Sequence, residues 1–189
     1  MLRPLLLVFA LASALLAQSA GRSGNRDEAS GSTASQQPTP KLLSTAMPSL
    51  REDPAAEGEL LAMANQSRRQ AGVAPLRMND DLMKAARAHA RLMIDQRQLS
   101  HQFDGEASLL KRLHETGVPL NSVAENVAYN YGAAQVFDSF MHSPPHRSNL
   151  LDPDFNAAAF VAIWSDGRLY VVQDFIRQTA EVTPAAQRK

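Results

Sequence analysis

Hydrophobic positions recur with helical spacing in the segment NDDLMKAARAHARLMIDQRQ. From Leu82, the residues Ala86, His89 and Met93 follow at offsets of 4, 7 and 11, so all four share one face of a helix. Asn79 stands directly before this segment, where its side chain can accept hydrogen bonds from the first free amides of the helix. The pattern therefore predicts an amphipathic helix that packs this face against a core.

Three other segments have the same helical spacing. EGELLAMANQSRRQAG ends at Gly72, SLLKRLHET opens on Ser108 and ends before Gly117, and GAAQVFDSFMHS ends before Pro144 and Pro145. Glycine commonly follows a helix C-terminus, and proline cannot continue a helix. The sequence thus predicts about four helices.

The period changes towards the end of the chain. NAAAFVAIW and RLYVVQDFI are rich in β-branched and aromatic residues, and Ser165-Asp166-Gly167 joins them with the composition of a tight hairpin turn. VAENVA is a shorter third candidate strand. Helices followed by strands predict the α+β class, with about four helices packed around a small antiparallel sheet.

Composition divides the chain into parts. Leu5 to Ala17 is an unbroken stretch of apolar and small residues that follows a positive N-terminus, so 1–20 is interpreted as a signal peptide, with an uncleaved anchor as the alternative. Residues 21–54 form a polar Ser/Pro/Gln-rich linker, 55–178 the folded domain and 179–189 a polar tail. The apolar stretch is shorter than a membrane span and no other segment comes close to that length, so the mature protein is expected to be secreted or periplasmic.

Two further counts restrict the chemistry. The chain has no cysteine, which excludes disulfides, thiolate metal ligands and a cysteine nucleophile. Residues 55–178 hold 12 Lys and Arg against 14 Asp and Glu, so the domain lacks the basic surface of a nucleic-acid-binding protein. The G-x-S-x-G and H-E-x-x-H motifs of hydrolases are also absent.

Several phrases in sequence order, together covering Glu57 to Ile176, resemble the CAP superfamily of cysteine-rich secretory, antigen 5 and pathogenesis-related proteins, in its cysteine-free bacterial form. The phrases are NQSRRQAGVAPL, KAARAHARLM, LSH, AENVA, FMHSPPHRSNLL and YVVQDF. The resemblance implies an α-β-α sandwich. It also implies a surface cleft that holds two histidines and acidic residues and sometimes a divalent metal.

On this resemblance the cleft residues are His101, Glu125 and His146. A second cleft glutamate of many family members follows a Trp-x-x-Glu pattern, and Phe140 and Ser143 stand at those positions here. The resemblance therefore implies a cleft with one acidic group fewer than four-ligand metal binding requires.

The residues themselves leave two interpretations of this cleft open. In a strand, Val123, Glu125 and Val127 share a face, so the carboxylate is partly desolvated and needs a cation or histidines opposite it to stay ionised. Two imidazoles and one carboxylate suit zinc or another divalent cation, so His101, Glu125 and His146 are candidate metal ligands. Alternatively, Glu125 accepts main-chain amide bonds and both histidines bond to carbonyl groups.

The remaining polar candidates are expected to be structural or solvated. His89 lies on the apolar face of its helix and is interpreted as a core histidine. His114 and His142 are expected at exposed helix positions, and Asn126 is expected to bond to main chain beside Glu125.

Three functions remain open on the sequence alone. The first is an exported binding module with a lipid, sterol-like or cell-wall ligand, a role implied by the family resemblance. The second is a metal-dependent, peptidase-like hydrolase in which Glu125 activates water. The third is a purely structural envelope protein. The missing hydrolase motifs favour a binding module over an enzyme.

Overall fold

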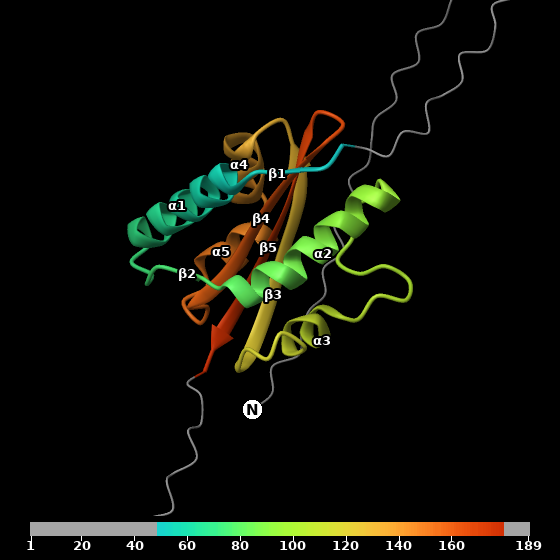
Figure 1. Cartoon of the computed structure of the whole chain (residues 1–189). Coiled ribbons are helices and arrows are strands. Elements are labelled where there is room, and N and C mark those ends of the chain that lie inside the picture. Colours follow the sequence, from blue (N-terminus) through green and yellow to red (C-terminus); the bar gives the residue numbers. More distant parts are fainter. Residues whose placement is uncertain (1–48, 180–189) are drawn as a thin grey trace, which may run out of the picture. The chain divides into compact units, whose positions relative to one another are not determined.

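Residues 49–179 are described by the computed structural model of the chain (Figure 1). The predicted signal peptide at 1–20, the predicted linker up to residue 48 and the tail from residue 180 lie outside this range. No helix within residues 49–179 is both long and apolar enough to cross a membrane.

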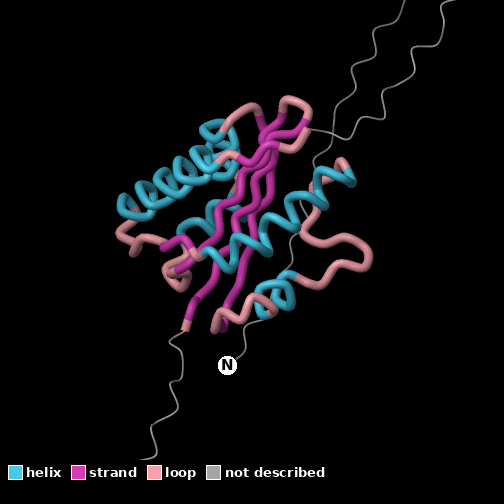
Figure 2. The backbone as a smooth tube through the Cα atoms, in the orientation of Figure 1, coloured by secondary structure: helices cyan, strands magenta, loops and turns pink. Residues whose placement is uncertain are grey.

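The central element is a five-stranded sheet, whose main path has the order β1-β4-β5-β3. These pairings are antiparallel, while the short strand β2 runs parallel to β4. The strands are β1 Arg51–Glu52, β2 Arg77–Met78, β3 Leu120–Asn130, β4 Ala157–Ser165 and β5 Arg168–Gln178. The three predicted strands are thus β3, β4 and β5, and β3 forms one edge of the sheet (Figure 2).

The hairpin between β4 and β5 has the predicted two-residue turn. Asp166 and Gly167 both have positive φ angles, 48° and 75°, as a type I′ turn requires. Ser165 faces Arg168 across the turn, and the register continues without a shift to Ala157 opposite Ile176. The turn therefore fixes which side chains of β5 point to each face of the sheet.

Helices cover both faces of the sheet. They are α1 Pro54–Gln70, α2 Asp80–Gln96, α3 Leu109–His114, α4 Ala133–His142 and α5 Pro144–Leu151. Figure 1 shows α2 and α3 on one face and α1, α4 and α5 on the other. The predicted α+β sandwich is confirmed.

Each face of the sheet carries its own hydrophobic core. Val161, Ile163 and Val172 pack with Leu82 and Met93 of α2 on the first face. Phe160, Val171 and Phe175 pack with residues of α1 and α4 on the second face. Because both faces are covered, β4 and β5 are apolar along nearly their whole length, as their sequences indicated.

The structure has a fifth helix that the sequence pattern did not predict. Pro144 and Pro145 end α4, as predicted, but they also occupy the first turn of α5. Proline suits that position because its fixed φ angle is helical and its missing amide would have no partner there. The segment HRSNLL is therefore helical, and it brings His146 towards the edge of β3.

The folded part begins before the predicted boundary at residue 55. Arg51 and Glu52 pair with Trp164 and Ile163 at the outer side of β4. Asp53 then caps α1, because its Oδ1 accepts a hydrogen bond from the amide of Ala56 at 3.1 Å. The last residues of the predicted linker thus belong to the sheet and to the start of α1.

Candidate functional site

Glu125 lies in the middle of the edge strand β3 on the face covered by α2 and α3. Its side chain is only 1% exposed. Arg112 donates a hydrogen bond from Nη2 to Oε2 at 2.6 Å, and His101 bonds through Nδ1 to Oε1 at 2.8 Å. A guanidinium and an imidazole thus occupy the two carboxylate oxygens and keep this carboxylate stable beside the core.

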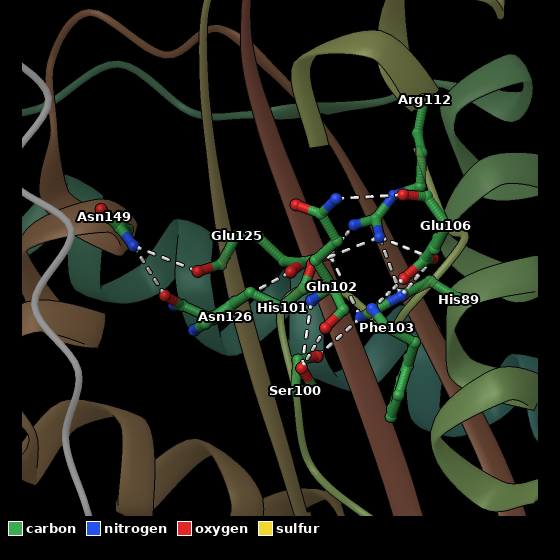
Figure 3. A network of polar contacts seen from close by, with 10 residues as sticks. All are labelled: His89, Ser100, His101, Gln102, Phe103, Glu106, Arg112, Glu125, Asn126 and Asn149. Carbon is green, nitrogen blue, oxygen red and sulfur yellow. Dashed lines mark hydrogen bonds and ion pairs between the residues drawn. The ribbon is translucent and has the colours of Figure 1, made fainter. Parts of the chain in front are cut away.

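Arg112 is the centre of the polar network in Figure 3, and sequence analysis missed it. It lies on α3 and is buried. Besides Glu125, it donates from Nη1 to Glu106 Oε1 at 2.7 Å and to the main-chain oxygen of His101 at 3.3 Å. One cation therefore holds two carboxylates and the segment that carries His101.

His89 supports the same segment from within the core. Its Nε2 donates to the main-chain oxygen of Ser100 at 2.8 Å, and its Nδ1 lies 2.7 Å from Glu106 Oε1. Burial, together with the charge of Arg112, lowers the pKa of His89. The prediction of a buried core histidine is confirmed, and its role is to fix the loop before His101.

Asp174 of β5 is a second acidic group that sequence analysis missed. It lies directly opposite Glu125 in the β3–β5 register and is 1% exposed. Among residues 49–179, neither of its carboxylate oxygens has a hydrogen-bond partner. Burial, and then the nearby charge of Glu125, hold the pKa of Asp174 well above its usual range.

The pKa of Glu125 reflects the same surroundings. Burial raises it to about 7, while Arg112 opposes this rise. Two carboxyl groups, Glu106 and Glu125, share the guanidinium of Arg112, while Asp174 lies opposite Glu125 without an ion pair among residues 49–179. Burial and the neighbouring charge of Glu125 thus favour the protonated form of Asp174.

His101 is the most accessible member of this network. Its side chain is 58% exposed, although Nδ1 is bound to Glu125. Partial burial and the charge of Arg112 lower the pKa of His101, which favours the neutral ring. When Glu125 is ionised it only accepts, so Nδ1 of the neutral ring carries the proton and Nε2 keeps its lone pair. Nε2 has no hydrogen-bond partner among residues 49–179.

His146 approaches the edge of β3 from the opposite face of the sheet. Its ring packs edge-on against Phe140 at 5.2 Å, and its main-chain oxygen accepts a bond from Asn126 Nδ2 at 3.1 Å. Burial, and then the charge of His101, lower the pKa of His146. The structure thus joins His101 directly to Glu125 and places His146 near this pair without a bond to either residue.

Asparagines connect α5 to β3 beside Glu125. Asn149 donates from Nδ2 to Asn126 Oδ1 at 2.9 Å and to the main-chain oxygen of Glu125 at 3.4 Å (Figure 3). Asn126 in turn donates to the side chain of Gln173 at 3.2 Å. The predicted main-chain contact of Asn126 is confirmed, and these bonds set the position of α5 relative to Glu125.

The donor set does not fit a divalent cation in this arrangement. Both oxygens of Glu125 are occupied, and Arg112 already supplies positive charge there. Among residues 49–179, no three His, Asp or Glu side chains are placed to hold one metal ion. Zinc binding by His101, Glu125 and His146, which the sequence suggested, would require Arg112 to release Glu125.

The other two histidines lie apart from this site. His142 is at the end of α4 with its side chain 79% exposed and bonds to the main chain of Asp138. His114 ends α3 and is also exposed. Both placements confirm the predictions and make these residues suitable controls for the cleft histidines.

Comparison with known proteins agrees with the fold. Residues 61–175 match the family described as Cysteine-rich secretory protein family, CAP. Among curated proteins, the chain is 29% identical over 102 residues to the uncharacterized protein YkwD of Bacillus subtilis. It is 31% identical over 125 residues to the uncharacterized membrane protein YlbC of the same organism. The aligned parts are 53% and 65% of this chain but only 40% and 35% of those proteins.

Three solved structures share the fold at low sequence identity. An outer surface protein from Borrelia burgdorferi has a TM-score of 0.66 at 19% identity, over 70% of this chain and 100% of that one. An extracellular SCP-domain protein from Bacillus anthracis has a TM-score of 0.61 at 22% identity, over 67% of this chain and 41% of that one. A cysteine-rich secretory protein from Staphylococcus aureus has a TM-score of 0.53 at 23% identity, over 67% of this chain and 40% of that one.

Proposed function

The chain belongs to the cysteine-rich secretory protein (CAP) family, and from this premise we propose that it is an exported binding module for a cell-envelope ligand. The ligand lies at the edge of β3, between His101 and His146. The predicted signal peptide supports export. The related solved proteins are described as an outer surface, an extracellular and a secretory protein, which agrees with that location.

The observation that carries this proposal is the fixed orientation of His101. Glu125 holds Nδ1 at 2.8 Å, Arg112 holds Glu125 at 2.6 Å, and Nε2 is left free on a side chain that is more than half exposed. Such a pre-oriented acceptor loses little conformational entropy when it binds a donor. The buried charges thus orient one accessible hydrogen-bonding atom, Nε2 of His101.

A metal-dependent hydrolase is less well supported by the same geometry. Glu125 would have to bind a metal or activate water, yet both of its oxygens are occupied by Arg112 and His101. The Glu125–His101 pair could orient a general base, but no serine or threonine hydroxyl bonds to His101 among residues 49–179. The site therefore favours binding over turnover.

A lipid ligand also has less support than a polar one. The apolar faces of α1, α2 and α4 are buried against the sheet, where they form the two cores. A hollow of about 280 Å³ beside the His101 loop is lined mainly by polar residues, among them Gln98, Ser100 and Gln102. This hollow is not lined by His101, Glu125 or His146, and its polar lining suits a ligand that forms hydrogen bonds.

The proposal is tested by co-sedimentation of the full chain with isolated bacterial cell walls that keep their attached proteins. We expect the parent to sediment with the walls and the His101→Ala/His146→Ala variant to lose most of this binding. The matched control is His114→Ala/His142→Ala, which removes two exposed histidines outside the cleft and should bind like the parent. Absence of parental binding, or equal binding by both variants, contradicts the proposal.

A further inference from the structure

The outer edge of β3 differs from the other edge of the sheet. At the opposite side, β1 pairs with one end of β4 and β2 with the other end. Within residues 49–179, no strand pairs with the outer side of β3, although β3 is 11 residues long. Exposed edge strands carry unpaired main-chain groups, and many proteins cover or interrupt such edges.

The hairpin register shows which main-chain groups of β3 point outwards. The two-residue turn bonds Ser165 to Arg168, so even-numbered residues of β5 bond to β4 and odd-numbered residues bond to β3. Consistently, Ile176 accepts a bond from the amide of Asn156 just before β4. On β3 the partners of the odd-numbered β5 residues are Ala124, Asn126 and Ala128.

The alternate residues of β3 therefore turn their amides and carbonyls away from the sheet. These residues are Val123, Glu125, Val127 and Tyr129. Among residues 49–179, the one hydrogen bond that reaches this row comes from Asn149 to the oxygen of Glu125, at a long 3.4 Å. Glu125 as a residue is 6% exposed, whereas its side chain is 1% exposed, so its accessible part is mainly main chain.

We propose that the ligand of this cleft is an extended peptide that adds a strand to β3 between Val123 and Tyr129. The row of outward groups presents partial charges that alternate between N–H and C=O and repeat every two residues, about 6.8 Å. An extended peptide carries the complementary charges at the same repeat, and strand addition is a common mode of peptide recognition. This inference rests on the proposed function and names the class of its ligand.

The two histidines flank this strand position from opposite faces of the sheet. A peptide bound along β3 would pass between His101 and His146, with its side chains alternating towards the two. Nε2 of His101 accepts hydrogen bonds in the neutral ring, so a peptide side chain with an N–H or O–H group fits opposite Glu125. Tyr129, which is 38% exposed, offers an aromatic surface further along the same face.

The test begins with a random heptapeptide library displayed on phage and selected against the full chain. A selected peptide is then synthesised in two forms, with N-methyl groups on either its odd-numbered or its even-numbered amides. Only one set of amides can face β3, so one form should bind at least about tenfold more weakly while the other binds within about threefold of the parent peptide. Each lost hydrogen bond is worth about two- to tenfold in affinity, so a form that loses several should bind at least about tenfold more weakly.

Amide hydrogen exchange of the chain supplies the second measurement. Without peptide, the amides of Ala124, Asn126 and Ala128 should exchange slowly, and those of Val123 and Tyr129 should exchange faster. Peptide binding should slow Val123 and Tyr129 specifically. If neither N-methylated form loses affinity, if protection appears elsewhere, or if no peptide is selected, the inference is overturned.

Two other occupants of the edge are distinguished in the same experiments. If the outward amides are already protected and protection grows with protein concentration, a second copy occupies the edge. If protection is lost on deleting residues 180–189, the chain covers its own edge. Either result overturns the inference. Wall binding that survives protease treatment of the walls also overturns it, yet leaves the proposed function standing.

Discussion

Among residues 49–179, two arginines are buried, and their surroundings differ sharply. Arg68 of α1 is fully buried and donates only to main-chain oxygens, those of Ala74, Leu150, Asp152 and Phe155, at 2.7–3.0 Å. Arg112 of α3 donates mainly to carboxylates and lies beside two histidines. The first arginine ties α1 to the loop before β2, to the end of α5 and to the segment after α5, whereas the second holds two carboxylates and the segment that carries His101.

The same kind of side chain thus serves stability in one place and lies within the proposed binding site in another. Main-chain oxygens do not titrate, so the contacts of Arg68 persist at any pH at which the protein folds. The partners of Arg112 change their charge between acid and neutral pH. Loss of Arg68 should therefore affect only stability, while loss of Arg112 should affect stability, its pH dependence and the cleft.

Arg68→Met should have the largest effect on stability. It leaves four buried carbonyl oxygens without their donor, so we expect the free energy of unfolding to fall by about 3–5 kcal/mol. Urea unfolding of the full chain measures this change. Arg69→Met is the matched control, because Arg69 is the exposed neighbour, and it should change the value by less than about 0.5 kcal/mol. A loss below about 1 kcal/mol for Arg68→Met would contradict its structural role.

Arg112→Met should lower the free energy of unfolding by about 3 kcal/mol at pH 7.5 and by clearly less at pH 5. Without the guanidinium, the pKa of Glu125 rises further above its value in the unfolded chain, because Arg112 opposes the effect of burial. A carboxyl group whose pKa is raised by folding destabilises the fold increasingly as pH rises through the folded-state pKa. Urea unfolding at the two pH values measures this, with Lys111→Met as the exposed control. An effect independent of pH would make Arg112 equivalent to Arg68.

At low pH, Asp174→Asn should change the free energy of unfolding least among these three substitutions. At high pH it should stabilise the protein relative to the parent. Asp174 is buried beside Glu125 with its pKa raised, so the parent loses stability as pH rises from about 4, the pKa of aspartate in the unfolded chain, towards that folded-state pKa. Asparagine cannot ionise, and we expect a change within about 1 kcal/mol at pH 5.5 but a relative gain in stability at pH 8.5. Thermal unfolding across this pH range measures the difference. Parallel stability curves for the two proteins would show that Asp174 does not carry a proton.

The elements were largely predictable because local patterns specify them. The Asn79 cap and the face from Leu82 to Met93 located α2, and Asp166-Gly167 located the hairpin. The sequence pattern predicted about four helices and not α5, because Pro144 and Pro145 end one helix and also begin the next. A proline pair permits both, and only the packing of Leu150 in the core decides between them.

The candidate site was only partly predictable, because its contacts join residues distant in sequence. The family resemblance identified His101 and Glu125, which are in contact. Arg112 looked like one more basic residue of a short helix, and nothing local links it to Glu125, 13 residues later. Asp174 did leave a signal: it is the one acidic residue in the apolar strand LYVVQDFI, and a charge in such a strand is buried.

The most direct test of the central claim, that Arg112 rather than a metal neutralises Glu125, is a calorimetric titration of the metal-stripped full chain with zinc. A parallel titration uses the His101→Ala/His146→Ala variant. The account predicts no micromolar binding by the parent, because Arg112 and His101 occupy both oxygens of Glu125. Micromolar binding by the parent that is lost in the variant would contradict it, and would establish His101, Glu125 and His146 as a metal site.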